Sequence, residues 1–169
     1  TVVMPAMDVM DSGRMAFVAD PTGAAFGLWE AGTHKGAQLV NEHGSFTWNE
    51  LLTDDTEAAA KFYVDAFGFR TEVSETPTGP YTSFWVEGNV EGNAAAGMMP
   101  KNPGMGPIPN YWGVYFAVDD VDQSVKAVQA NGGNVIMPSM DIPGIGKMAV
   151  VQDPQGAVFT AMTFANEQR

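Results

Sequence analysis

One acidic residue, Glu50, stands where it could take part in chemistry. It lies two positions after Trp48 in the strand-like run from Phe46 to Leu52, and side chains two apart in a strand share one face of the sheet. A carboxylate on such a face can act as a general base, or it can anchor a cationic or hydroxylated ligand. It can equally be a structural group that accepts hydrogen bonds from backbone or indole N–H groups. Both interpretations stay open at this point.

A second set of side chains could bind a flat organic molecule. Its members are aromatic or apolar, apart from one threonine, and each stands in a strand-like run. Apolar, aromatic pockets with a few polar groups suit such ligands. The same side chains could instead fill the space themselves, because protein interiors are densely packed. The set comprises Trp48, Tyr111, Tyr115, Thr160 and Met162.

An internal repeat positions part of this set. The segment Val2–Asp8 matches Val135–Asp141, and the match continues without a gap to Phe26 and Phe159. More than half of about 25 aligned positions are identical, which is the signature of a repeated structural unit. Each copy predicts a strand, a turn, a second strand, an Asp-Pro-x-Gly turn and a third strand.

A weaker repeat predicts two helices. One helical pattern begins at Asp54-Asp55 and closes at Gly68, and the other begins at Asp119-Asp120 and closes at Asn131-Gly132-Gly133. The spacings Asp54 to Glu57 and Asp120 to Gln123 are those of a capping box. A strand precedes each helix and three strand-like runs follow it.

These patterns predict an α+β fold built from βαβββ units. We expect a complete domain at residues 46–166, made of paired units at residues 46–100 and 110–166. Residues 1–31 are then the last three strands of an incomplete unit, and residues 32–45 form a linker.

Three motifs carry a family resemblance: Phe62-Tyr63-x-x-x-Phe67-Gly68-Phe69, Val118-Asp119-Asp120-Val121 and Asp153-Pro154-x-Gly156. With the βαβββ pattern they resemble the vicinal oxygen chelate superfamily, also called the glyoxalase/bleomycin-resistance/dioxygenase fold, over essentially the whole chain. The resemblance implies that two units pair and enclose a cleft between curved sheets. It also implies that the candidate ligand-binding side chains face this cleft.

A finer resemblance concerns the start of the complete domain. The run Gly36-Ala37-x-Leu39-Val40-Asn41-Glu42, followed by Trp48-x-Glu50-Leu51, looks like actinobacterial two-domain members described as hydroxylase-like or antigen-like. Those proteins carry four units. We therefore expect the chain to be a C-terminal part of a longer protein, beginning partway through its second unit.

The resemblance further implies where a metal would bind. Metal-using members place a His, Glu or Gln ligand on the first and last strand of each unit. Aligned through the helix junctions, these positions fall on Trp48, Gly113 and Thr160, within Ala95–Gly97, and on Gly27 in the incomplete unit. None of them is a good ligand for a divalent cation. The sequence therefore predicts no metal and no other cofactor.

The composition argues against several kinds of partner and location. The net charge is −12, with 20 acidic residues against 8 basic ones, which argues against nucleic acid and anionic membranes as partners. No run of eighteen apolar residues is present, so no membrane span is expected. The chain has no cysteine, which excludes disulfides and permits a reducing compartment. We expect a cytoplasmic protein.

Three functions fit these features, and whether the protein is an enzyme stays open. The first is a metal-free glyoxalase-like or bleomycin-resistance-like protein that binds a small organic molecule. The second is an isomerase or hydroxylase-type enzyme with Glu50 as general base. The third is a scaffold or assembly module, because an incomplete unit exposes a sheet edge that invites other strands. The exposed edge also predicts self-association, or packing with a missing N-terminal domain.

Overall fold

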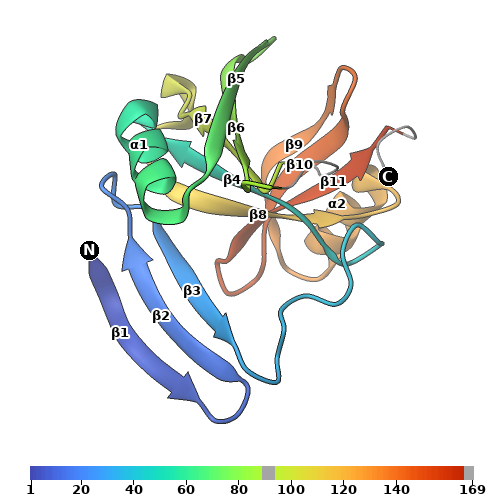
Figure 1. The fold of residues 1–169 in the computed structure, drawn as a ribbon. Helices are drawn as coiled ribbons and strands as arrows, with labels where there is room; N and C mark the ends of the chain where they lie inside the picture. Colours follow the sequence, from blue (N-terminus) through green and yellow to red (C-terminus); the bar gives the residue numbers. More distant parts are fainter. Residues whose placement is uncertain (89–93, 166–169) are drawn as a thin grey trace. The chain divides into compact units, whose positions relative to one another are not determined.

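The computed structural model describes residues 1–88 and 94–165, and its elements are strands β1 to β11 with helices α1 and α2 (Figure 1). It confirms the predicted α+β class. The chain divides into two compact units, Thr1–Gly36 with Asn49–Trp112, and Ala37–Trp48 with Gly113–Arg169. The predicted end of the last βαβββ unit, residue 166, lies outside the described residues.

The first compact unit begins with a separate antiparallel sheet. Its strands are β1 (Val2–Val9), β2 (Gly13–Ala19) and β3 (Ala25–Ala31), in that order across the sheet (blue in Figure 1). These are the three strands predicted for residues 1–31. The Asp-Pro-x-Gly turn between β2 and β3 places Gly23 at φ 94°, a conformation that glycine adopts without strain.

The same compact unit contains a βαβββ arrangement. It comprises β4 (Phe46–Thr53, of which Asn49 onward belongs to this unit), α1 (Thr56–Phe67), β5 (Arg70–Thr76), β6 (Gly79–Trp85) and β7 (Ala96–Pro100). The strands lie in the order β5-β6-β7-β4, and β4 runs parallel to β7.

The first turn of α1 differs by one residue from the prediction. Asp55, not Asp54, caps the helix, and its carboxylate accepts a hydrogen bond from the Ala58 N–H at 2.9 Å. Asp54 instead accepts a hydrogen bond from the Asn110 side chain at 2.8 Å. The capping box predicted at Asp54 is therefore wrong. The predicted end is confirmed, because Gly68 closes the helix in the left-handed conformation at φ 67°.

The second compact unit repeats the arrangement. It contains β8 (Tyr111–Ala117, from Gly113 onward), α2 (Val121–Ala130), β9 (Asn134–Ile142), β10 (Gly146–Gln152) and β11 (Val158–Phe164). The order is β8-β11-β10-β9, with β8 and β11 parallel. Asp120 caps α2 as predicted, since its carboxylate accepts from the Gln123 N–H at 2.9 Å. Neither α1 nor α2, the α-helices of the described ranges, has the length and apolar run that a membrane crossing needs.

Within the second compact unit, hydrogen bonds join residues 37–48 to the end of β8. The Gly44 N–H donates to the Ala117 carbonyl at 2.8 Å, and the Ala117 N–H donates to the Ser45 carbonyl at 2.9 Å. The ring of His43 accepts a hydrogen bond from the Asp119 N–H at 3.1 Å. This segment therefore adds backbone hydrogen bonds at the end of β8.

Each helix covers one face of the strands in its own βαβββ arrangement. Under α1, the core includes Leu51, Tyr63, Phe84 and Met98, all almost fully buried. Under α2, a smaller core contains Val121, Ala149 and Val151, with Phe159 packed against it. Side chains alternate along a strand, so the neighbours of these core residues point to the face that the helix does not cover.

A chain of buried polar groups fixes the β1–β3 sheet against α1. Asp20, only 3% exposed, accepts a hydrogen bond from the Tyr63 hydroxyl at 3.0 Å. The Tyr63 oxygen in turn accepts from the Trp112 indole N–H at 2.8 Å. Burial, with the charge of Asp20 as a smaller cause, raises the pKa of Tyr63 well above its ordinary value. The hydroxyl therefore stays protonated and keeps donating to Asp20.

The β1–β3 sheet also carries exposed apolar side chains. Such surfaces favour association when they are contiguous. Self-association through this sheet stays a prediction. The exposed residues are Val2, Val3, Met7, Met10, Phe17, Leu28 and Trp29.

The chain of polar groups yields a stability prediction. Tyr63→Phe leaves the Asp20 carboxylate and the Trp112 N–H without their buried partner, so we expect a loss of about 1–3 kcal/mol in the free energy of unfolding. Urea denaturation measures this loss. Asp153, the repeat counterpart of Asp20, gives a matched control: Asp20→Asn should destabilise the protein clearly more than Asp153→Asn. Equal losses for the two asparagine variants would contradict the role given to the Tyr63 bond.

Candidate functional site

Two adjacent residues of β4, Glu50 and Leu51, point to opposite faces of the sheet. Leu51 is fully buried in the core under α1. Glu50, the preceding residue, therefore points to the opposite face of the sheet. Its side chain is nevertheless only 7% exposed, and it lies beside Gly97 in the parallel ladder between β4 and β7. The structure thus holds a carboxylate on the face that α1 leaves uncovered.

Tyr111 lies within electrostatic reach of Glu50. The tyrosine is half-buried. The pKa of its hydroxyl is raised above the ordinary tyrosine value, mainly by burial and secondly by the negative charge of Glu50. Tyr111 therefore remains a neutral hydrogen-bond donor through the physiological range. Of the sequence-predicted site residues, Glu50 and Tyr111 fall in the first compact unit.

Tyr81 is a member of this face that the sequence did not reveal. A side-chain carbon at Gly97 would collide with the Tyr81 hydroxyl, so this hydroxyl lies directly over Gly97, next to Glu50 in the ladder. Phe84 points into the core under α1, which by alternation turns Tyr81 to the opposite face. We call Glu50, Tyr81 and Tyr111 the Glu50 face. It combines one carboxylate with two phenol hydroxyls.

The other predicted site residues belong to the second compact unit. Tyr115 and Met162 are 7% and 4% exposed and pack together with Met148. Trp48 packs against this cluster. Thr160 is buried beside Tyr115 in the ladder between β11 and β8. Trp48, Tyr115 and Met162 therefore pack together on the face of the strands away from α2, and Thr160 lies beside Tyr115.

The donor set in the structure does not fit the metal that the family resemblance implies. A divalent cation of this kind needs several imidazole or carboxylate ligands at short range. The described ranges 1–88 and 94–165 contain no group of three or more His, Cys, Asp or Glu side chains that could hold one. Glu50 faces Gly97 across the ladder, and a single carboxylate is too few ligands for a stable site.

Comparison with known proteins places these features in a family. The family model described as Glyoxalase/Bleomycin resistance protein/Dioxygenase superfamily matches residues 45–160. A Mycobacterium tuberculosis protein named "Putative glyoxylase CFP32" is 46% identical over 167 residues, which are 99% of this chain and 62% of that protein. The anthracycline biosynthesis protein DnrV of Streptomyces peucetius is 36% identical over 163 residues, 95% of this chain and 56% of that protein.

A solved structure supports the same fold. The Mn(II)-bound glyoxalase from Novosphingobium aromaticivorans superposes with a TM-score of 0.59 at 14% sequence identity, covering 96% of this chain and 54% of that one. The chain spans less than two thirds of the length of CFP32 and DnrV. The family match over residues 45–160 and the βαβββ architecture confirm the resemblance carried by the motifs: the chain belongs to the glyoxalase/bleomycin resistance protein/dioxygenase superfamily.

Proposed function

We propose that the chain binds a small organic molecule at the Glu50 face and does so without a metal ion. The observation that carries this proposal is the Glu50 carboxylate itself, nearly buried yet on the sheet face away from α1. A charged group removed from water is costly unless it is compensated. A ligand that donates hydrogen bonds or carries a positive charge would supply further compensation.

The chemistry of the face defines the ligand class. The Glu50 carboxylate accepts hydrogen bonds, and the Tyr111 hydroxyl, kept protonated by its raised pKa, can donate one. A ligand with a hydroxyl or ammonium group near a carbonyl oxygen would match both. The name of DnrV refers to anthracycline biosynthesis, and anthracyclines are flat, hydroxylated aromatic compounds. This similarity supports a hydroxylated aromatic ligand for the present chain.

Proton transfer is a second candidate function at the same face. The Coulombic effect of Glu50, which helps to raise the pKa of Tyr111, favours this function. A carboxylate can take a proton from a bound substrate while a neighbouring phenol stabilises the oxygen that becomes negative. Isomerase reactions at a carbon next to a carbonyl group include such a step. In this alternative, Glu50 is the general base.

Ligand binding can be tested with doxorubicin, a hydroxylated, cationic anthracycline whose fluorescence changes on binding. We expect Glu50→Gln to weaken binding about tenfold, because a hydrogen bond to a charged group is lost. Glu72→Gln alters an exposed carboxylate on β5 and should leave binding unchanged. Unchanged doxorubicin binding in Glu50→Gln would refute the proposal. A large loss of thermal stability in that variant would instead support a structural carboxylate.

The electrostatic link between Glu50 and Tyr111 gives a second test. In Glu50→Gln the repulsive negative charge is gone, so the pKa of Tyr111 should fall. It should remain above the ordinary tyrosine value, because burial is the larger cause of the shift. A pH titration of ¹³C-labelled tyrosine by NMR, assigned with Tyr111→Phe, measures the pKa. The Glu72→Gln variant should show no change, and an unshifted Tyr111 in Glu50→Gln would contradict the arrangement.

Independence from metal gives a third test. Protein purified without added metal should contain far less than one equivalent of manganese, iron, nickel or zinc, because the described side chains do not form a suitable ligand set. Added Mn²⁺ should not raise the thermal unfolding temperature. Elemental analysis and a thermal shift assay measure these quantities. Stoichiometric metal in the purified protein would overturn the metal-free proposal.

A further inference from the structure

The indole nitrogen of Trp85, at the end of β6, is a buried polar atom without a hydrogen-bond partner. In the described part of the chain, residues 1–88 and 94–165, every other buried side-chain nitrogen or oxygen has one. A buried N–H group that donates to nothing costs free energy, and a hydrogen-bond acceptor would recover it. Such a group in a folded protein calls for an explanation, and a ligand with an acceptor atom provides one.

Trp85 lies on the same face of the sheet as Glu50. Phe84 is fully buried in the core under α1, so alternation turns Trp85 to the face that α1 leaves uncovered. Ser83 pairs with Gly97, and Gly97 pairs with Glu50. Two strand spacings and two residues along β6 therefore separate Glu50 from Trp85, about 12 Å between their Cα atoms. Since both side chains reach over this face, a ligand of two fused rings can extend from one to the other.

Arg70 supplies a second donor beside the indole. It is the neighbour of Trp85 across the ladder between β5 and β6, and its guanidinium lies over the ring, 5.2 Å from the centroid. The Arg70 side chain is 62% exposed, and its contact with Glu72 at 3.5 Å is an exposed ion pair that contributes little. The guanidinium can therefore turn at small cost. An oxygen atom that reaches the Trp85 N–H can then accept hydrogen bonds from both side chains.

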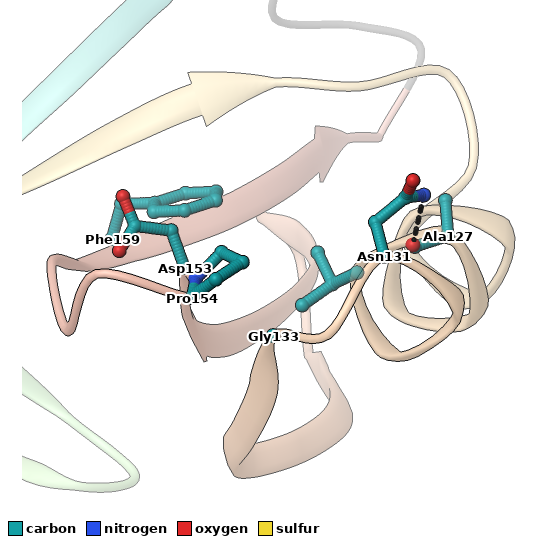
Figure 2. A pocket seen from close by; sticks show the side chains of 7 residues that line it. Ala127, Asn131, Gly133, Asp153, Pro154 and Phe159 are labelled. Atoms are coloured by element: carbon teal, nitrogen blue, oxygen red, sulfur yellow. Dashed lines mark hydrogen bonds between the residues drawn. The ribbon is translucent and has the colours of Figure 1, made fainter.

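The pocket beside α2, in the second compact unit, is a weaker candidate for a ligand site (Figure 2). The carboxylate among its described lining residues, that of Asp153, already accepts hydrogen bonds from the N–H groups of Gln155 and Ala157, both at 2.9 Å. Other lining residues, such as Val128 and Phe159, are apolar. The unpaired donor at Trp85 is therefore the stronger indication of a ligand.

We propose that Trp85 and Arg70 form a subsite at the end of the Glu50 face and that this Trp85 subsite binds a carbonyl oxygen of the ligand. The inference rests on the proposed function, because the same ligand places its hydroxyl or ammonium group at Glu50. Arg70 turns aside from the ring, and the oxygen accepts from the indole N–H and from the guanidinium. A neutral carbonyl fits better than a carboxylate, since Glu50 and the net charge of −12 repel anions. The ligand class is thus a flat aromatic ketone or quinone.

The first experiment compares 6-acetyl-2-naphthol with 6-ethyl-2-naphthol. The two compounds share the rings and the hydroxyl and differ in the carbonyl oxygen. Isothermal titration calorimetry with the full chain measures both dissociation constants. The acetyl compound should bind about fivefold more tightly, as expected for a hydrogen bond between neutral groups. Equal dissociation constants would overturn the proposal.

Two variants with matched controls test the assignment of residues. Trp85→Phe keeps an aromatic ring under Arg70 and removes the N–H, so it should weaken the acetyl compound about fivefold and leave the ethyl compound unchanged. Trp29→Phe removes the indole N–H that donates to the His34 carbonyl and should affect neither. Arg70→Gln should also weaken only the acetyl compound. Arg14→Gln makes the same change of charge at an exposed arginine on β2 and should not.

A ligand without a hydroxyl tests the Trp85 subsite separately from Glu50. In ¹⁵N–¹H NMR spectra, 2-acetonaphthone should shift the indole N–H signal of Trp85, which is identified by its absence from Trp85→Phe. The shift should occur in Glu50→Gln as in the unchanged chain, and 2-ethylnaphthalene should not cause it. This shift, together with naphthol binding that does not depend on Glu50, would support the subsite and refute the proposed function.

The opposite combination would refute the Trp85 subsite alone. In that case Glu50→Gln weakens both naphthols, while the unchanged chain binds the two with the same dissociation constant. A Trp85 indole signal that 2-acetonaphthone does not shift would also overturn the proposal. The N–H would then meet water or another part of the protein instead of a ligand.

Discussion

The alternation of side chains along each strand is the constraint on which the rest of the structure depends. In β4 it sends Leu51 into the core under α1 and Glu50 to the other face. In β10 it sends Ala149 and Val151 under α2 and Met148 to the other face. In each βαβββ arrangement, one face of the strands thus packs against the helix and buries apolar surface. The opposite face does not pack against a helix and can carry polar groups.

Much of this arrangement could be predicted from the sequence, because repeats and periodicity are local signals. The match of residues 2–26 with 135–159 gave the strand pattern, and alternation gave the face of Glu50. The position of Tyr81 could not be found in this way, since it depends on how β6 pairs with β7 around Gly97. The prediction placed the cap of α1 at Asp54 rather than Asp55 because two adjacent aspartates fit the same capping pattern.

In the proposed function, the charge of the Glu50 face distinguishes this chain from a metal-dependent relative. A divalent cation presents positive charge and attracts ligand oxygens that are negative or can become so. A carboxylate with phenol neighbours presents the opposite sign and favours ligands that donate hydrogen bonds or carry positive charge. The net charge of −12 reinforces this preference over the whole molecule. A shared βαβββ fold therefore does not imply a shared class of ligand.

The sequence similarity of β1–β3 and β9–β11 has a consequence for the kinetics of folding. Two segments of the chain carry the same Asp-Pro-x-Gly turn and the same phenylalanine at matching positions. Such near-degenerate partners create kinetic traps. The segments must then be discriminated where they differ, for example at Trp29, whose indole N–H donates to the His34 carbonyl at 3.0 Å. Its counterpart, Met162, has no such donor, so this local bond favours the correct partner.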